Sequence, residues 1–222
     1  MSEIYVFGDS AAQGIILDAE GNYRVSRKGS MRLLKRSGYP IRNYAVHGYT
    51  ARQGLESFHT TPTEPGGACV IEFGGNDCDL DWDAVTRDPE TFHEGKVPLA
   101  EFRGLLRQFI REVRERDLEP ILVTPLPLMS ERYYRWVSRG RDKNRILRYL
   151  QNDPESISRW QERYAIAVRE AAAECHCRLA DLRSWLLDRL EYPSLICEDG
   201  IHPNEAGQEY IARAAAEHFP CP

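Results

Sequence analysis

Short apolar segments alternate with longer amphipathic segments along this chain. The apolar segments are Ile4–Phe7, Ile41–Val46, Cys69–Phe73, Ile121–Thr124 and Arg178–Leu182. They are nearly continuous apolar runs rather than alternations of apolar and polar residues, which is typical of parallel strands buried on both faces. The pattern therefore predicts a central parallel sheet of about five strands.

The amphipathic segments between these runs predict helices. In Leu99–Val113 the apolar residues recur at steps of three and one, which places them on one helical face and turns Arg103 and Arg107 outward. Ile157–Cys175 and Asn204–Phe219 carry similar patterns. Strands that alternate with helices indicate an α/β fold in which helices cover the sheet. We expect a single domain over residues 1–222.

Two stretches do not fit this simple alternation. Asp79–Pro98 is acidic and has the character of a loop. Leu126–Pro154 contains three tyrosines and a tryptophan among seven basic and three acidic side chains. A connection of this length is uncommon unless it is functional or has helices of its own. We interpret residues 126–154 as a helical cap inserted over the edge of the sheet.

Composition limits the possible function classes. Hydrophobic residues make up 42% of the chain, which is enough for one sizeable core. Lys and Arg number 29 against 34 Asp and Glu, and a net charge of −5 argues against a dedicated nucleic-acid binder. No apolar run reaches the ~18 residues that cross a bilayer, so no stable membrane insertion is expected. The six cysteines are too few for a disulfide framework, and no signal peptide is visible, so we expect a cytoplasmic protein with free thiols.

Small, polar or glycine-rich segments follow the first three predicted strands, and a fourth precedes the last helix. These segments are Gly8-Asp9-Ser10, His47-Gly48-Tyr49-Thr50, Gly74-Gly75-Asn76-Asp77 and Asp199-Gly200-Ile201-His202-Pro203. In open α/β sheets, ligands bind beyond the carboxyl ends of the strands. The four segments are therefore expected to meet at one edge of the sheet and form a site.

The residue types in these segments suit acyl transfer. A serine hydroxyl becomes a nucleophile when a nearby base takes its proton, and His202 is the candidate base for Ser10. Asp199 lies three residues before His202, so within one turn its carboxylate can orient the imidazole. The Ser10 N–H, the Gly48 N–H and the Asn76 side-chain amide are the candidate oxyanion donors. Glycine suits position 48 because a side chain there would crowd the approaching carbonyl of the substrate.

With these four blocks in this order, the chain resembles the SGNH (GDSL) hydrolase superfamily from residue 3 to about residue 215. Its signature residues would be Ser10, Gly48, Asn76 and His202. The resemblance implies a flavodoxin-like, three-layer α/β/α sandwich and ester hydrolysis through an acyl-serine intermediate. Ala11 stands where the family usually has leucine, and the cap is larger than in compact bacterial thioesterases and lysophospholipases; both differences concern substrate choice more than the chemistry.

Structural roles remain open for some of these residues. Ser10 could also cap a helix, Asp199 could form a turn, and Asn76 could tie a loop to backbone groups. We interpret Asp9 and Asp77 as structural residues that hold adjacent loops.

Other polar residues give weaker signals. Glu72 is expected to be paired within its strand, and His47 could either line the site or serve only in packing. Cys175-His176-Cys177 has the wrong spacing for a metal knuckle, and no second ligand pair is evident, so no metal site is predicted.

The leading hypothesis is a serine esterase that acts on a small-molecule ester or thioester and needs no metal or organic cofactor. The arginine-rich cap favours short acyl groups on a polar or carbohydrate-like alcohol. The alternatives are a lysophospholipase or thioesterase for longer acyl chains, and a non-catalytic module that binds carbohydrate or lipid. Ser10 lacks the Gly-x-Ser-x-Gly elbow of α/β-hydrolases, and the glycine patterns of nucleotide binders are absent. The sequence makes no prediction of the oligomeric state.

Overall fold

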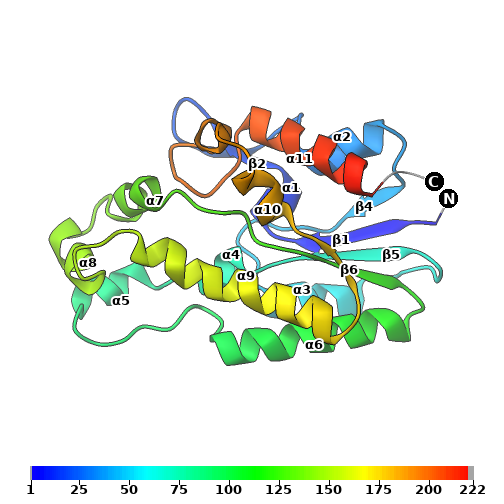
Figure 1. Cartoon of the computed structure of the whole chain (residues 1–222), viewed down its shortest axis with the longest axis horizontal. Helices are drawn as coiled ribbons and strands as arrows, with labels where there is room; N and C mark the ends of the chain where they lie inside the picture. The colour runs from blue at the N-terminus through cyan, green and yellow to red at the C-terminus, as the bar shows by residue number, and fades with distance from the viewer. Residues whose placement is uncertain (1, 220–222) are drawn as a thin grey trace.

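Five parallel strands form the middle layer of the protein in a computed structural model that describes residues 2–219 (Figure 1). The strands are β1 (Ile4–Gly8), β4 (Ile41–Asn43), β5 (Ala68–Glu72), β6 (Glu119–Val123) and β7 (Arg178–Ala180). Their spatial order is β4-β1-β5-β6-β7, which is the flavodoxin-like order and confirms the predicted α/β sandwich.

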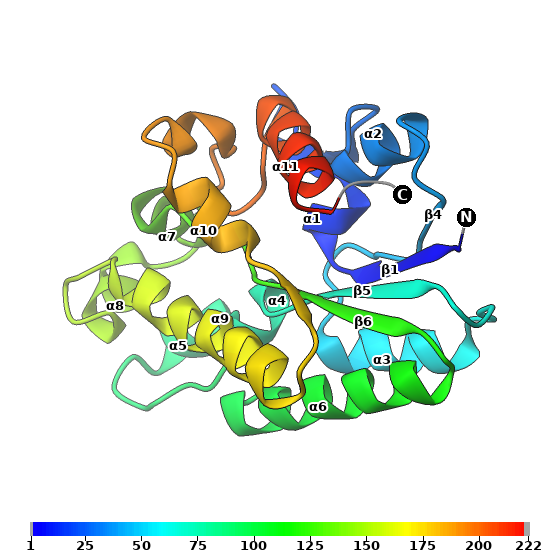
Figure 2. The same ribbon diagram turned by 45° about the vertical axis from the view of Figure 1, so that its right-hand side comes forward.

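Helices cover both faces of the sheet (Figure 2). One layer consists of α3 (Ala51–Thr60), α6 (Leu99–Glu115) and α9 (Ser156–Glu174). The other layer contains α2 (Ser30–Arg36), α10 (Leu182–Leu187) and α11 (Glu205–His218). Successive strand residues serve opposite layers: Phe7 packs toward α3 and α6, whereas Val6 packs toward α2 and α11. Within residues 2–219, none of the helices combines the length and apolar character needed to cross a bilayer.

Several boundaries differ from the sequence-based prediction because polar side chains end the strands early. β4 ends at Asn43 instead of Val46, since the Asn43 side chain accepts from the Ala45 N–H and donates to the Ala12 carbonyl. β7 ends at Ala180 because Asp181 caps α10 through the Ser184 N–H.

Some elements were not predicted, among them a short helix and a hairpin. The acidic stretch expected to be a loop contains α5 (Trp82–Arg87), whose first turn is capped by the Asp81 side chain. A separate antiparallel hairpin consists of β2 (Ile15–Leu17) and β3 (Tyr23–Val25). Its six strand residues are too few for a clear period-2 pattern.

The cap of residues 126–154 contains two helices, α7 (Ser130–Val137) and α8 (Lys143–Tyr149), as expected. Together with α5 and the start of α9 they enclose a small apolar core that includes Trp82, Tyr133 and Ile146. The remaining short elements, α1 (Ser10–Gln13), α4 (Gly75–Cys78) and the 3-10 turn η1 (Tyr192–Leu195), lie in the connections around the carboxyl ends of the strands and before α11.

Gly207 supports the start of α11, the helix that follows the His202 loop. A Cβ at this position would lie 2.3 Å from the Leu195 carbonyl oxygen. We expect Gly207→Ala to lower the free energy of unfolding by roughly 1–3 kcal/mol, as overpacking does. Gly104→Ala in α6 is the matched control: its Cβ would meet no atom within 4 Å, and it should gain about 0.5–1 kcal/mol. Urea denaturation measures both, and equal stability of Gly207→Ala and wild type would contradict the prediction.

Candidate active site

Ser10, His202 and Asp199 meet at the carboxyl edge of the sheet. Ser10 is the first residue of α1, directly after β1, and the other two residues lie on the loop before α11. The Ser10 Oγ lies 2.9 Å from His202 Nε2, and His202 Nδ1 lies 2.6 Å from Asp199 Oδ2. A hydroxyl, an imidazole and a carboxylate are thus joined in one continuous chain of hydrogen bonds.

The turn at residues 199–202 directs the carboxylate back to the imidazole. Asp199 Oδ1 accepts the N–H groups of Ile201 and His202, each at 3.1 Å. Gly200 has a φ of +82°, and a Cβ there would lie 2.7 Å from backbone atoms of the α7 region, so the turn requires glycine. The Asp-Gly turn and the carboxylate–imidazole contact are therefore parts of the same structure.

Electrostatics keep Asp199 ionised. Burial works against its charge, but the hydrogen bond and electrostatic attraction of the His202 imidazole, together with the two N–H donors, outweigh it and lower the pKa of Asp199. An ionised carboxylate beside Nδ1 holds the ring proton there, which leaves Nε2 to accept from the Ser10 hydroxyl.

Asn76, in α4 after β5, lies next to Asp9. Its side-chain Nδ2 donates to Asp9 Oδ2 at 3.0 Å, while Asp9 Oδ1 accepts the Ala11 N–H at 3.0 Å. Asp9 therefore fixes which end of the amide is the donor and connects two loops. One amide hydrogen of Asn76 is used in this bond, and an amide nitrogen carries two.

Gly48 has a φ of +83°, and a Cβ built there meets no atom within 4 Å. The left-handed backbone is one reason for the glycine, and the crowding of a substrate carbonyl stays a prediction. Its neighbour His47 lines the cavity beside Ser10, and the His47 N–H donates to Gln13 Oε1 at 2.8 Å. The role of the Gly48 N–H stays a prediction.

Three buried carboxyl groups lie beneath these loops. Glu72 accepts the Asp9 N–H at 3.2 Å, and Asp77 accepts the N–H groups of Ala51 and Gly74, each at 2.9 Å. Burial raises the pKa of Asp9 and, with the neighbouring Asp9 carboxyl, that of Glu72. Burial also raises the pKa of Asp77 to about 7, although its two N–H donors oppose the shift.

The raised pKa of Asp77 predicts a pH-dependent stability. An acid whose pKa is higher in the folded than in the unfolded chain binds more protons when folded, so unfolding becomes easier as the pH rises from about 4 to 7. One such group contributes at most about 1.4 kcal/mol per pH unit. Asp77→Asn should flatten this slope in urea denaturation between these pH values. An unchanged slope would mean that Asp77 is already ionised at pH 4.

An aromatic cluster of Tyr23, His47 and Trp136 lies beside His202; of these, only His47 was considered as a residue that lines the site. The Tyr23 ring centroid lies 4.9 Å from that of His202, 5.2 Å from that of His47 and 5.9 Å from that of Trp136. Tyr23 comes from β3 and Trp136 from α7, so two segments far apart in the chain meet here. A Gly21-Asn22 turn before Tyr23 was the only sequence signal for the hairpin.

A cavity of about 840 Å³ extends from Ser10 and His202 beneath the cap. Aromatic side chains such as Trp82, Trp136 and Trp160 alternate on its walls with charged ones such as Arg141 and Glu90. Within residues 2–219, no three His, Cys, Asp or Glu side chains lie close enough together to hold a metal ion.

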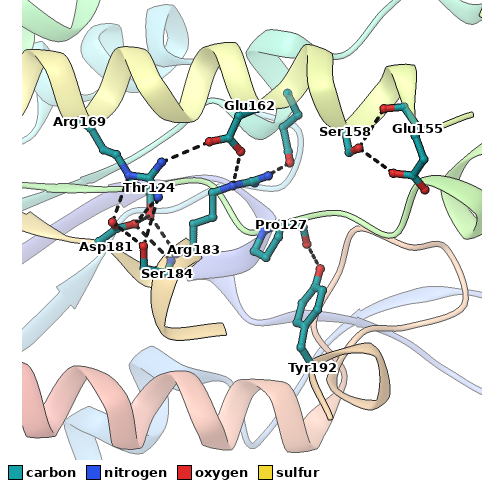
Figure 3. A network of polar contacts seen from close by, with 11 residues as sticks. Thr124, Pro127, Glu155, Ser158, Glu162, Arg169, Asp181, Arg183, Ser184 and Tyr192 are labelled. Atoms are coloured by element: carbon teal, nitrogen blue, oxygen red, sulfur yellow. Dashed lines mark hydrogen bonds and ion pairs between the residues drawn. The ribbon is translucent and has the colours of Figure 1, made fainter. Parts of the chain in front are cut away.

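A buried polar network braces the cavity wall at the ends of β6 and β7 (Figure 3). Arg183, which is only 5% exposed, forms an ion pair with Glu162 (Nε–Oε2 2.6 Å) and donates to Gln161, a cavity-lining residue, at 3.0 Å. Arg169 holds both oxygens of the Asp181 carboxylate at 3.1 Å. These bonds tie α9 to the loop that begins α10.

The model of the GDSL-like lipase/acylhydrolase family matches residues 6–210. The chain belongs to this family. All four blocks of the site lie within the matched residues. A GDSL esterase/lipase of Arabidopsis thaliana is 26% identical over 228 residues, which cover 97% of this chain and 84% of the plant protein.

Solved structures agree with the fold. A lipase/acylhydrolase from Enterococcus faecalis is 21% identical, with a TM-score of 0.67 over 99% of this chain and 95% of that one. Axe2, an acetylxylan esterase from Geobacillus stearothermophilus, is 20% identical, with a TM-score of 0.65 over 100% and 95% of the two chains. At these identities the likeness concerns the fold.

Proposed function

We propose that this protein is a serine esterase that hydrolyses short acyl esters of a polar, carbohydrate-like alcohol. The observation that carries the proposal is the unbroken chain from Ser10 through His202 to Asp199 at one end of a large cavity. Membership of a lipase/acylhydrolase family supports the same reaction class.

In this mechanism His202 Nε2 takes the Ser10 proton as Oγ attacks the ester carbonyl. The resulting tetrahedral oxyanion faces the N–H groups of Ser10 and Gly48 and the free amide hydrogen of Asn76. His202 then returns the proton to the departing alkoxide, leaving an acyl-serine. A water molecule, deprotonated by His202, attacks the acyl carbon. As the bond from the acyl carbon to Ser10 Oγ breaks, His202 returns the proton to Oγ, and the carboxylic acid is released.

The lining of the cavity supports a polar alcohol. Aromatic faces such as Trp82 and Trp160 can contact the apolar face of a sugar ring, and Glu90, Arg141 and Arg148 can bind its hydroxyl groups. An alkyl chain would leave these charged groups facing hydrocarbon, which is unfavourable. The acetylxylan esterase among the structural neighbours acts on an ester of this kind.

A series of acyl lengths on one fixed alcohol tests the substrate class. We expect kcat/KM to be highest for acetyl and to fall with each longer chain, because a longer acyl chain would meet the charged side chains that line the same cavity as Ser10. In parallel, a fluorophosphonate probe should label the protein at Ser10, located by peptide mass spectrometry.

The outcomes separate the competing hypotheses. Labelling of Ser10 with faster turnover of long-chain lysophospholipid would replace the short-acyl proposal by a lipase function. No labelling, together with saturable binding of carbohydrate, would indicate the non-catalytic module.

A further inference from the structure

Tyr23 covers the His202–Asp199 pair on its accessible side. Tyr23 is itself 36% exposed to solvent, whereas His202 is 4% exposed and Asp199 is fully buried at 0%. The ring centroids of Tyr23 and His202 are 4.9 Å apart at an interplanar angle of 56°. Burial, first, and the nearby Asp199 carboxylate raise the pKa of Tyr23, so its hydroxyl stays protonated.

We propose that Tyr23 is a positioning residue: its ring holds the His202 imidazole between Ser10 and Asp199 and shields the imidazole–carboxylate hydrogen bond from water. This inference rests on the proposed esterase function. It assigns a role to the β2–β3 hairpin, which contributes no residue to the chemical steps.

The hairpin is anchored so that it can hold Tyr23 in place. The Leu17 N–H donates to Cys197 Sγ at 3.5 Å, two residues before Asp199. Arg24 pairs with Glu205 of α11 at 3.5 Å, and Lys28, just beyond β3, pairs with Glu209 at 2.9 Å. The hairpin is thus attached to the loop that carries the His202 imidazole and to α11, the helix that follows this loop.

Trp136 supports Tyr23 from the cap. Its ring centroid lies 5.9 Å from that of Tyr23, and the guanidinium carbon of Arg139 lies 3.9 Å above the Trp136 ring. Trp136 also lines the substrate cavity. A substrate that contacts Trp136 would therefore also affect the position of Tyr23, which packs against His202. Through these contacts the cap is coupled to the His202–Asp199 pair.

Loss of the Tyr23 ring should slow the reaction for a geometric and an electrostatic reason. A displacement of about 1 Å in a catalytic group can cost about 100-fold in rate. A hydrogen bond to a charged carboxylate is also stronger where water is excluded. The ring of Tyr23 provides both the contact and the exclusion of water, so phenylalanine should serve nearly as well.

The experiment compares Tyr23→Phe and Tyr23→Ala with wild type on a small aryl acetate. We expect Tyr23→Ala to lower kcat by about 10- to 100-fold with little change in KM, because the defect lies in the reacting groups. Tyr23→Phe, which keeps the ring, should stay within about threefold of wild type. The far-downfield proton resonance of His202 Nδ1 should broaden in Tyr23→Ala through exchange with water and remain sharp in Tyr23→Phe.

Two matched variants serve as controls. Val25→Ala truncates an exposed apolar residue of the same strand and face, and should leave kcat unchanged. Tyr134→Ala removes an aromatic residue from the same helix as Trp136, and its hydroxyl bonds to the Lys143 carbonyl outside the cavity. Trp136→Ala should lower kcat where Tyr134→Ala does not.

A kcat for Tyr23→Ala within twofold of wild type would overturn the inference, as would equal losses in Tyr23→Phe and Tyr23→Ala. A wild-type protein that neither hydrolyses the aryl acetate nor reacts with the fluorophosphonate would instead refute the proposed function.

Discussion

Replacing His202 by alanine is expected to lower kcat for an aryl acetate by about 10⁴-fold or more, and Ser10→Ala should have an effect of similar size. Both residues act in one proton transfer, since the Ser10 Oγ lies 2.9 Å from His202 Nε2. Without the imidazole the hydroxyl keeps its proton, and without the hydroxyl the imidazole has no nucleophile to activate. Steady-state kinetics with the purified variants measures both losses.

A variant that lacks both side chains tests more sharply than the single variants whether Ser10 and His202 act together. Groups that act as a unit have strongly non-additive effects, so Ser10→Ala/His202→Ala should be no slower than either single variant. His47→Ala is the control for the identity of the base, because its ring centroid lies only 5.7 Å from that of His202. We expect a loss of at most about tenfold for that variant. A His47 variant as impaired as the His202 variant would identify a different base.

The parallel strands and the meeting of the four blocks could be predicted from sequence because both depend on local patterns, whereas the order of the strands was only implied by the family resemblance. Buried parallel strands appear as continuous apolar runs, and the loops at their carboxyl ends share one edge by topology. The contact between Ser10 and His202 is therefore a consequence of the fold, although 192 residues separate them.

The hairpin that carries Tyr23 could not be predicted in the same way. Its strand residues Tyr23–Val25 are all exposed, so no buried face imposes a pattern on the sequence. Its position depends on tertiary bonds to Cys197 and Glu205, which no local signal reports. The function of the hairpin appears only when Tyr23 is seen against His202.

Gly48 shows a different limit of sequence reasoning. The sequence points to this glycine as part of the site, but its φ of +83° is a property of the folded loop that the sequence alone does not report. The early end of β4 has a similar cause, since the Asn43 side chain donates to the carbonyl of Ala12, which sequence spacing alone cannot place beside it. The end of β7 before Asp181 has a local cause, because Asp181 caps α10 through the Ser184 N–H.

Asn76→Ala is expected to lower kcat by about 10²- to 10³-fold with KM nearly unchanged, as the loss of one oxyanion donor does. The amide would bind the oxyanion only in the transition state, so kcat and kcat/KM should fall together. Asn76 is oriented by Asp9, which accepts one of its two amide hydrogens at 3.0 Å. The second hydrogen is then available for the oxyanion.

Asp9→Asn tests this orientation separately. An asparagine side chain has one acceptor oxygen, which cannot serve both the Ala11 N–H and the Asn76 amide as the two Asp9 oxygens do. We therefore expect a loss in kcat smaller than that of Asn76→Ala, and no further loss when the two changes are combined. Asn144→Ala, at the exposed start of α8, is the control for asparagine loss in general. If Asn76→Ala raised KM and left kcat intact, Asn76 would bind the ground state of the substrate, and the oxyanion would depend on the backbone N–H groups alone.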